Sequence, residues 1–239
     1  MTITLVPVLT IAFPAAVFDT NCYVIATGPG EECVIVDPGI GVEAPLAEVL
    51  AEHRLKPAAV LLTHGHVDHV YSVTPVCGGD TAAYIHEDDR YRLVDPVAGL
   101  DRGLVMMMEQ QFGTRATWRE PEHIVMMTDH ETLTLAGLRI TVLHAPGHTE
   151  GSVMFTLPHV PDGMPGGPMA VSATCLSGDV LFAGSIGRSD LAGGDPRAMA
   201  RSLRDVVLPL PDDLLVLPGH GPATTIGRER VSNPHLQGL

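Results

Sequence analysis

The chain is poor in positive charge. Lys and Arg total 14 of its 239 residues against 28 for Asp and Glu, and Lys56 is the one lysine, so the formal net charge at pH 7 is −14. Proteins that follow a nucleic-acid backbone neutralise its phosphates with lysine and arginine. The charge balance has the wrong sign for that task, and we expect no nucleic-acid partner.

Cysteine is scarce as well. The four cysteines, at positions 22, 33, 77 and 175, are scattered and form no C-x-x-C pair. A chain of this size does not need disulfides to stabilise its core. We therefore expect a reducing, cytoplasmic setting in which each cysteine is a small buried apolar side chain.

Long apolar runs are absent. Residues 1–28 are largely apolar, but no positive charge precedes the apolar part, and Pro7 and Pro14 interrupt it. This predicts strands and not a signal peptide. No segment reaches the roughly 18 consecutive apolar residues that a membrane helix needs, so we expect no membrane partner.

Along the chain, segments with a strand pattern alternate with segments with a helix pattern. Short β-rich or apolar runs predict strands at 21–27, 33–39, 58–63, 152–157 and 169–179, and a hairpin over 132–147 that turns at Ala136 and Gly137. Helical spacing predicts helices at 42–55 and 195–207, a helical and loop-like region at 86–128 with core or pocket-wall methionines at 106–108, and a mobile surface loop at 158–168.

Metal-ligand side chains follow four of the apolar strands. They are His64, His66, Asp68 and His69 after strand 58–63, His148 after "ITVLHAPG", Asp179 after "ATCLSG" and His220 after "LLVLPG". Strand ends on one side of a sheet lie together in space, so these side chains can converge on a single cleft. Unrelated solvated histidines would have no reason to repeat this context.

Spacing within the first cluster indicates two metal positions. His64 and His66 project to the same side of an extended segment and can close on one cation. Asp68 and His69 lie in a turn that enters the next helix and point to a neighbouring position. Imidazole suits zinc and iron alike, and a carboxylate can bridge two ions, which makes Asp179 the candidate bridge.

Four motifs, "THGHVDH", "APGHTEGS", "SGD" and "LPGHGP", occur in this order over residues 63–222 and together resemble the metallo-β-lactamase superfamily of hydrolases. The resemblance implies an α+β fold, a four-layer αββα sandwich of two mixed sheets flanked by helices. It implies one domain over residues 1–239, built of two fused halves, with no separate C-terminal helical domain. It also implies the ligand sets: His64, His66 and His148 for the first metal, Asp68, His69 and His220 for the second, and Asp179 as the bridge.

Residues 178–195 and 219–236 resemble, more narrowly, the short bacterial glyoxalase II-like (hydroxyacylglutathione hydrolase-like) proteins. The implied reaction is hydrolysis of a thioester such as S-lactoylglutathione or a related acyl-thiol. True β-lactamases of the superfamily commonly carry a cysteine where Asp179 falls, so we expect no antibiotic hydrolysis. The rival is a persulfide dioxygenase of the same superfamily, which uses a single iron on His64, His66 and His148.

The expected cofactors are two divalent ions, with zinc the first choice and iron or manganese the alternatives. The pair would share a water and lower its pKa to give a hydroxide nucleophile, which Asp68 could also orient as a catalytic residue. Arg188 and Arg228, or Arg230 beside it, are candidate anchors for a substrate carboxylate. The expected partner is a small thioester, and a homo-oligomer is compatible with the sequence.

The remaining histidines are expected to be structural. They are His53, His123, His130, His144, His159 and His235. His144 lies four residues before His148, where the same strand passes into a loop. It could therefore contact a metal ligand from the side away from the metal.

Overall fold

Two mixed β-sheets pack against each other in the computed structural model, which describes residues 7–97, 100, 102–112, 118–162 and 171–239. The first sheet has the order β10-β1-β2-β3-β4-β5-β6, with β1 (Pro7–Pro14), β2 (Asn21–Ala26), β3 (Glu32–Val36), β4 (Lys56–Leu61), β5 (Ala82–His86), β6 (Ile124–Met127) and β10 (Val160–Pro161). The second has the order β15-β14-β11-β9-β8-β7, with β7 (Thr132–Leu135), β8 (Leu138–His144), β9 (Val153–Leu157), β11 (Ala173–Gly178), β14 (Leu214–Pro218) and β15 (Thr224–Thr225). A small ribbon pairs β12 (Leu181–Phe182) with β13 (Ser185–Ile186).

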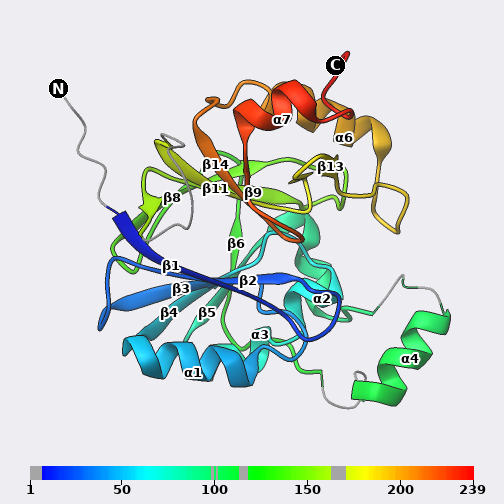
Figure 1. Cartoon of the computed structure of the whole chain (residues 1–239). Helices are drawn as coiled ribbons and strands as arrows, with labels where there is room; N and C mark the ends of the chain where they lie inside the picture. The colour runs from blue at the N-terminus through cyan, green and yellow to red at the C-terminus, as the bar shows by residue number, and fades with distance from the viewer. Residues whose placement is uncertain (1–6, 98–99, 101, 113–117, 163–170) are drawn as a thin grey trace.

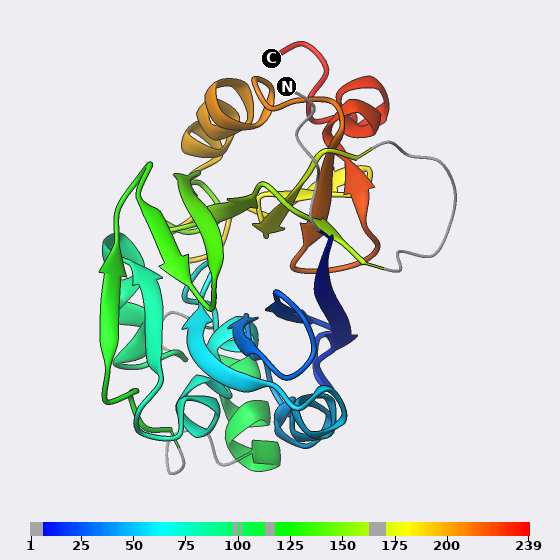
Figure 2. The same cartoon turned by 90° about the vertical axis from the view of Figure 1, so that its left-hand side faces the viewer.

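Helices lie outside the two sheets, on their outer faces or beside the edge of the sandwich. They are α1 (Glu43–His53), α2 (Val67–Val70), α3 (Val73–Cys77), the 3-10 helix η1 (Glu87–Leu93), α4 (Arg102–Phe112), α6 (Pro196–Ser202), the π-helical turn η2 (Leu203–Val207) and α7 (Ile226–Ser232). In Figure 1, α1 lies below the first sheet and α6 and α7 lie above the second. Figure 2 shows the same layers after a quarter turn. The predicted four-layer αββα sandwich is confirmed.

Alternation along the strands builds this layering. Tyr23 and Ile25 of β2 face the apolar layer between the two sheets, whereas Cys22 and Val24 face the layer under α1 and α3. Leu61 and Val60 of β4 divide in the same way. A strand that is buried on both faces reads as one continuous apolar run, which is why the pattern at 58–63 predicted a central strand.

The predicted hairpin is present, and its turn has the geometry that a two-residue connection needs. Ala136 and Gly137 both have positive φ, 50° and 71°. Positive φ at both central positions matches the right-handed twist of the strands that it joins. The predicted helices are also present, at α1 and at α6 with η2.

Some boundaries and elements differ from the sequence predictions. β4 ends at Leu61 and not at 63, so two residues separate it from His64. The region 86–128, expected to hold helix and loop, contains the four-residue strand β6 at the edge of the first sheet. Residues 160–161 of the expected loop form β10 beside β1, and residues 163–170 lie outside the described part.

The methionines at 106–108 do not share one environment. Met108 is fully buried in a small apolar cluster, as predicted, but Met106 is 62% exposed and so is not core. On a helix, adjacent residues point in different directions, so three consecutive positions cannot all face the core. The four cysteines are buried and unpaired, as expected, and burial raises the pKa of Cys33 and of Cys175 to about 12. None of the helices in the described part is long and apolar enough to span a bilayer.

Phe155 offers a test of the layer between the sheets. It is fully buried on β9 among side chains from both sheets. We expect Phe155→Ala to lower the free energy of unfolding by about 3–5 kcal/mol, because it leaves a cavity in a packed core. Urea unfolding measures the loss. Val231→Ala, at a position 81% exposed, is the control and should change stability by less than about 0.5 kcal/mol; equal effects would contradict the layering.

Candidate metal centre

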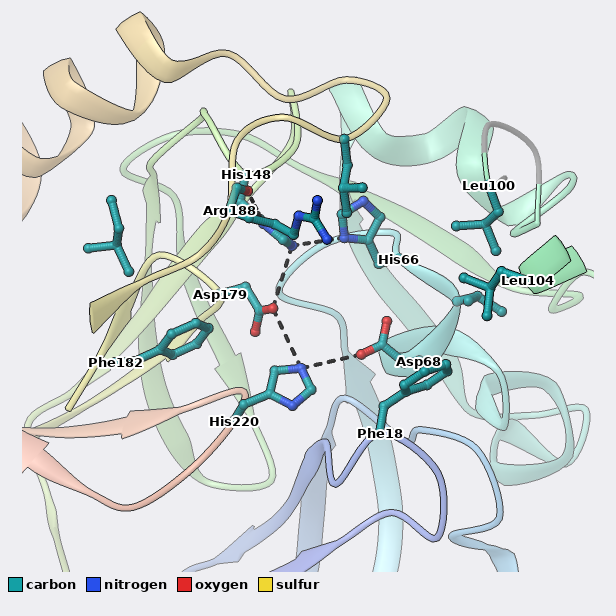
Figure 3. A pocket seen from close by; sticks show the side chains of 13 residues that line it. Phe18, His66, Asp68, Leu100, Leu104, His148, Asp179, Phe182, Arg188 and His220 are labelled. Carbon is teal, nitrogen blue, oxygen red and sulfur yellow. Dashed lines mark hydrogen bonds and ion pairs between the residues drawn. The ribbon is translucent and has the colours of Figure 1, made fainter. Parts of the chain in front are cut away.

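Seven side chains from four separate segments meet at one edge of the sandwich. His64 and His66 follow β4, Asp68 and His69 lie in α2, His148 follows β8, Asp179 follows β11 and His220 follows β14. Three overlapping groups among them hold ligand atoms that all lie within 4.8 Å of one another. The convergence that the strand-end pattern predicted is therefore present, as Figure 3 shows for five of the seven.

The first predicted ligand set is tightly gathered. His66 Nδ1 lies 3.1 Å from His64 Nε2 and 2.8 Å from His148 Nε2. Two nitrogens that bind one tetrahedral zinc at 2.0–2.1 Å lie roughly 3.3 Å apart. The nitrogens of the three rings thus lie nearly as far apart as nitrogens that bind the same cation.

The second predicted set adjoins the first. Asp68 Oδ2 lies 3.5 Å from His69 Nε2 and 3.3 Å from His220 Nε2. Asp179 stands between the sets, with Oδ1 3.4 Å from His69 Nε2 and Oδ2 3.5 Å from both His148 Nε2 and His220 Nε2. This is the position from which one carboxylate can reach two cations, and the bridging role stays a prediction.

Two buried atoms in this cluster are left without a hydrogen-bond partner. They are His69 Nε2 and Asp179 Oδ1, which face each other. A buried polar atom without a partner is costly, and native proteins seldom keep one. Imidazole nitrogens and carboxylate oxygens are ligands of zinc, iron and manganese. The residues present therefore fit a pair of divalent cations.

Hydrogen bonds behind the rings set which nitrogen faces the cluster. The Thr63 hydroxyl donates to Asp37 Oδ2 at 2.6 Å, so it can only accept from His64 Nδ1 at 3.1 Å. His148 Nδ1 donates to the backbone carbonyl of Arg188 at 2.7 Å. In both rings Nδ1 carries the hydrogen, which leaves the Nε2 lone pair for a metal.

Asp37 holds the ligand loop from below. Its Oδ2 also accepts from His69 Nδ1 at 2.9 Å, and its Oδ1 accepts from the Thr63 backbone N–H at 2.8 Å. Asp37 is 1% exposed and has φ of 50°, a conformation that Asp tolerates better than most residues. Sequence reasoning missed this residue; its place directly after strand β3, in "VDPG", was the available signal.

Asp89 joins the two loops that carry the first ligand set. This fully buried carboxylate accepts from the backbone N–H groups of Gly65 and Gly151 and from the Thr149 hydroxyl, all at 2.7–2.9 Å. Arg92 Nε lies 3.2 Å from its Oδ1 and offsets its charge. The loop of His64 and His66 is thereby fixed to the loop of His148. Sequence analysis missed Asp89 too, since nothing in "HEDDR" separates it from its exposed neighbours.

Backbone close to the ligands leaves no room for side chains. A Cβ at Gly219 would overlap Asp179 Oδ1 and approach His69 Cε1 to 2.8 Å. Gly178 has φ of 48° and lies against Thr63. These glycines let the turns before His220 and Asp179 pass close to the cluster, because they have no Cβ.

The first histidine set is neutral. Burial and then the neighbouring imidazoles lower the pKa of His64, and burial together with His148 lowers the pKa of His66 to about 2. Burial also lowers the pKa of His148. Neutral imidazole is the form that binds metal, so this set needs no proton loss to do so.

Two members of the second set, His69 and Asp68, are charged at neutral pH. Burial by itself would lower the pKa of His69, but Asp179, Asp68 and Asp37 outweigh it and raise that pKa to about 10. Burial would raise the pKa of Asp68, but His69 and His220 outweigh it and hold that pKa below its usual range. An ionised carboxylate therefore faces a protonated imidazole at neutral pH.

The ligand groups open into a cavity of about 490 Å³ lined by His66, Asp68, His148, Asp179, His220, Arg188 and apolar side chains. Arg188 was predicted to anchor a substrate carboxylate. Its Nε and Nη2 each lie 2.8 Å from an oxygen of Asp190, so that role requires this exposed pair to open and stays a prediction. Arg228 is exposed on α7 and is not among the lining residues, and Arg230 Nε binds Asp212. Neither is placed to anchor a substrate in this cavity.

His144 belongs to a separate group. Its ring stacks on His86 at 4.0 Å, and its Nε2 lies 2.8 Å from the Glu150 carbonyl oxygen and 3.8 Å from Asp88 Oδ2. His86, Asp88 and His144 form a further group of ligand-type atoms within 4.8 Å. Because stacked rings point their in-plane lone pairs side by side, the two imidazoles do not converge on one cation in this arrangement.

Comparison with known proteins agrees with this geometry. The family model described as "Metallo-beta-lactamase superfamily" matches residues 15–161. An uncharacterised protein of Mycobacterium tuberculosis is 43% identical over 231 residues, covering 95% of this chain and 97% of that protein. A probable metallo-hydrolase of Bacillus subtilis is 34% identical (95% and 96% covered), and the hydroxyacylglutathione hydrolase GloC of Haemophilus influenzae is 32% identical (93% and 95% covered).

Solved structures share the fold over nearly the entire chain. The B3 metallo-beta-lactamase BLEG-1 superposes with a TM-score of 0.76 at 35% identity, covering 96% of this chain and 100% of that one. TTHA1623, solved in a di-iron-bound form, superposes with a TM-score of 0.67 at 34% identity, covering 94% and 98%.

Proton release tests the charged second set. At pH 7 His69 carries a proton because its pKa is about 10, and a metal must displace that proton. We expect Zn²⁺ binding to chelator-treated protein to release a proton at pH 7, with the apparent affinity rising up to about tenfold per pH unit between pH 7 and 9. Calorimetry in two buffers of different ionisation enthalpy measures the release. Identical heats in the two buffers would show that His69 is already neutral.

Asp37 provides a second test. In Asp37→Asn the amide group must place a donor against His69 Nδ1 or Thr63, so the His69 ring loses its fixed orientation. We expect the affinity for the second metal to fall about 10–100-fold. Metal content after dialysis against buffered Zn²⁺ measures this. Asp212→Asn, which changes an exposed aspartate remote from the centre, should retain the full content; equal content in Asp37→Asn would contradict the role given to Asp37.

Proposed function

The chain belongs to the metallo-beta-lactamase superfamily, and on that premise we propose that it is a metal-dependent hydrolase that cleaves a thioester. The observation that carries the proposal is the pair of adjoining ligand sets around Asp179, which opens into a cavity of substrate size. The similarity to a protein named hydroxyacylglutathione hydrolase supports the thioester.

A bound pair of divalent cations, zinc being our first choice, would supply a water acidic enough to attack at neutral pH and a positive charge to polarise the carbonyl. His64, His66 and His148 would hold one cation, Asp68, His69 and His220 the other, and Asp179 both. The fixed Nε2 atoms of His64 and His148 and the Nδ1 of His66 present lone pairs with little reorganisation.

Asp68 is the side chain best placed to orient the attacking water. Its carboxylate lines the cavity, accepts from the Thr20 hydroxyl at 3.0 Å and keeps a depressed pKa, so it stays an acceptor at neutral pH. A hydrogen-bond acceptor beside the water directs one of its hydrogens away from the substrate. The water oxygen is then turned toward the carbonyl carbon.

A thioester suits a site without a dedicated acid. Apart from the ligand-type residues, Arg188 is the one titratable group among the described residues that line the cavity. A thiol leaving group has a pKa near 8.5, so it departs as thiolate with little protonation. An alcohol or amine leaving group would need a proton donor that this part of the cavity does not offer.

Metal content combined with a thiol-release assay tests the proposal. We expect two metals per chain and release of free thiol from a panel of thioesters that includes S-lactoylglutathione. His66→Ala removes a member of the first set and should lower kcat/KM at least about a hundredfold. His130→Ala, at a side chain 79% exposed, is the matched control and should keep full activity.

Three outcomes would contradict the proposal. One is unchanged thioesterase activity in His66→Ala. Another is ring opening of a β-lactam without any thioester cleavage. The third is one iron per chain with sulfite formed from glutathione persulfide and oxygen, which would indicate the dioxygenase.

A further inference from the structure

The cavity has an apolar wall on both sides of the ligand groups. Apart from Val67, its apolar lining consists of Phe18, Leu100, Leu104, Phe182, Ile186 and Leu191. Figure 3 shows Phe182 on one side of the ring of ligand side chains and Leu100 and Leu104 on the other, with Phe18 beside Asp68. An apolar group attached to a carbonyl at the metal positions would therefore meet apolar surface in either direction.

The side of this wall formed by Leu100 and Leu104 is part of a packed apolar cluster, whereas Phe18 is 44% exposed. Val67, Leu100 and Leu104 pack with Ile40 and Met108, both of which are at most 1% exposed. The open side of the cluster faces the cavity, and its buried side fixes the wall in place. An apolar group that binds to a fixed apolar wall is buried without the entropy cost of ordering the protein side chains.

The cavity is poor in groups that bind anions. Besides the histidines, Arg188 is the one cationic side chain among the described lining residues. Its Nε and Nη2 donate hydrogen bonds to the carboxylate of Asp190. Carboxylates and phosphates are normally recognised by free Arg or Lys side chains. The formal net charge of −14 adds to this, since it disfavours the approach of anionic molecules. Glutathione, with two carboxylates, is a poor match for these walls.

We propose that the preferred substrates are thioesters with an apolar acyl chain on a thiol that carries no anionic group near the sulfur. The inference rests on the proposed thioesterase function and specifies its substrate class. Water adds to the carbonyl carbon, the carbon–sulfur bond breaks, and the products are a carboxylate, a thiol and one proton. The acyl chain lies in the cavity, with Leu100 and Leu104 on one side of it and Phe182 on the other.

A chain-length series on a neutral thiol tests the class. The metal-loaded full chain is assayed with the acetyl, butanoyl and hexanoyl thioesters of N-acetylcysteamine and with S-lactoylglutathione. We expect kcat/KM to rise about threefold per added methylene, as burial of each CH₂ allows, and the hexanoyl thioester to exceed S-lactoylglutathione at least tenfold. A flat series, or S-lactoylglutathione as the better substrate, overturns the inference.

Variants of the two walls locate the effect. Leu104→Asn and Phe182→Ser should each reduce the ratio of hexanoyl to acetyl kcat/KM at least fivefold. Met106→Asn, on the same helix as Leu104 but 62% exposed, should leave the ratio within twofold of the native value. Thermal unfolding identifies any variant that does not fold, and the other wall variant then decides. A ratio unchanged in a folded wall variant contradicts the inference.

The two proposals fail in different ways. If no thioester of either thiol is cleaved by the metal-loaded chain, the proposed function fails and the substrate class fails with it. If S-lactoylglutathione is cleaved well while acyl length has no effect, the thioesterase function stands and the apolar substrate class alone is overturned.

Discussion

The centre depends on bringing unsatisfied ligand atoms together in a buried place. His69 Nε2 and Asp179 Oδ1 face each other across 3.4 Å without a hydrogen-bond partner, and the nitrogens of the first set are as closely spaced. Left alone, the crowded and neutral nitrogens of the first set oppose folding, because buried polar groups lose their hydration. The apolar layer between the two sheets offsets that penalty, since packing one sheet on the other is what places the ends of β4, β8, β11 and β14 at one edge. A bound cation would coordinate these ligand atoms and remove that penalty, which would add to the binding free energy.

Two carboxylates that do not face the ligand cluster hold its geometry. Asp37 ties Thr63 to His69, and Asp89 ties the loop before His66 to the loop after His148. Each accepts several hydrogen bonds at once from groups in different segments. Loops are the least constrained parts of a fold, so a ligand set built on loops needs such contacts to keep its geometry within a fraction of an ångström. In the first set His66 is the N-cap residue of α2, whereas His64 and His148 lie on loops that Asp89 joins.

The sequence predicted the layers and the converging ligand side chains because both follow from local patterns. Two-sided apolar strands such as 58–63 need a covered sheet, and a histidine or aspartate after each strand end must lie at a sheet edge. The roles of Asp37, Asp89 and Arg188 depend on which groups meet across the fold, and spacing carries no such information. Arg188 illustrates this: its side chain was the candidate anchor, but its backbone carbonyl holds His148 while its guanidinium pairs with Asp190. The strand β6 was missed because four residues are too few to show a period.

The metal centre by itself does not decide the substrate. The same fold with at least 32% identity over nearly the full chain occurs in proteins named as a hydroxyacylglutathione hydrolase and as a B3 metallo-beta-lactamase, so reactions on different carbonyl compounds are associated with one architecture. What can differ is the wall around the ligands. Apart from Val67, its described residues come from segments that hold no ligand, and they are Leu100, Leu104, Phe18, Leu191 and, from the β12–β13 ribbon, Phe182 and Ile186. Substitutions at Leu100 and Leu104 change no ligand and none of the hydrogen bonds behind the ligands, whereas Phe182 also packs edge-on against the His220 ring, with the ring centroids 6.1 Å apart. Because the wall and the ligands lie on separate segments, substrate preference in this chain can change without loss of the metal centre, and the apolar character of the wall is the feature that specifies it.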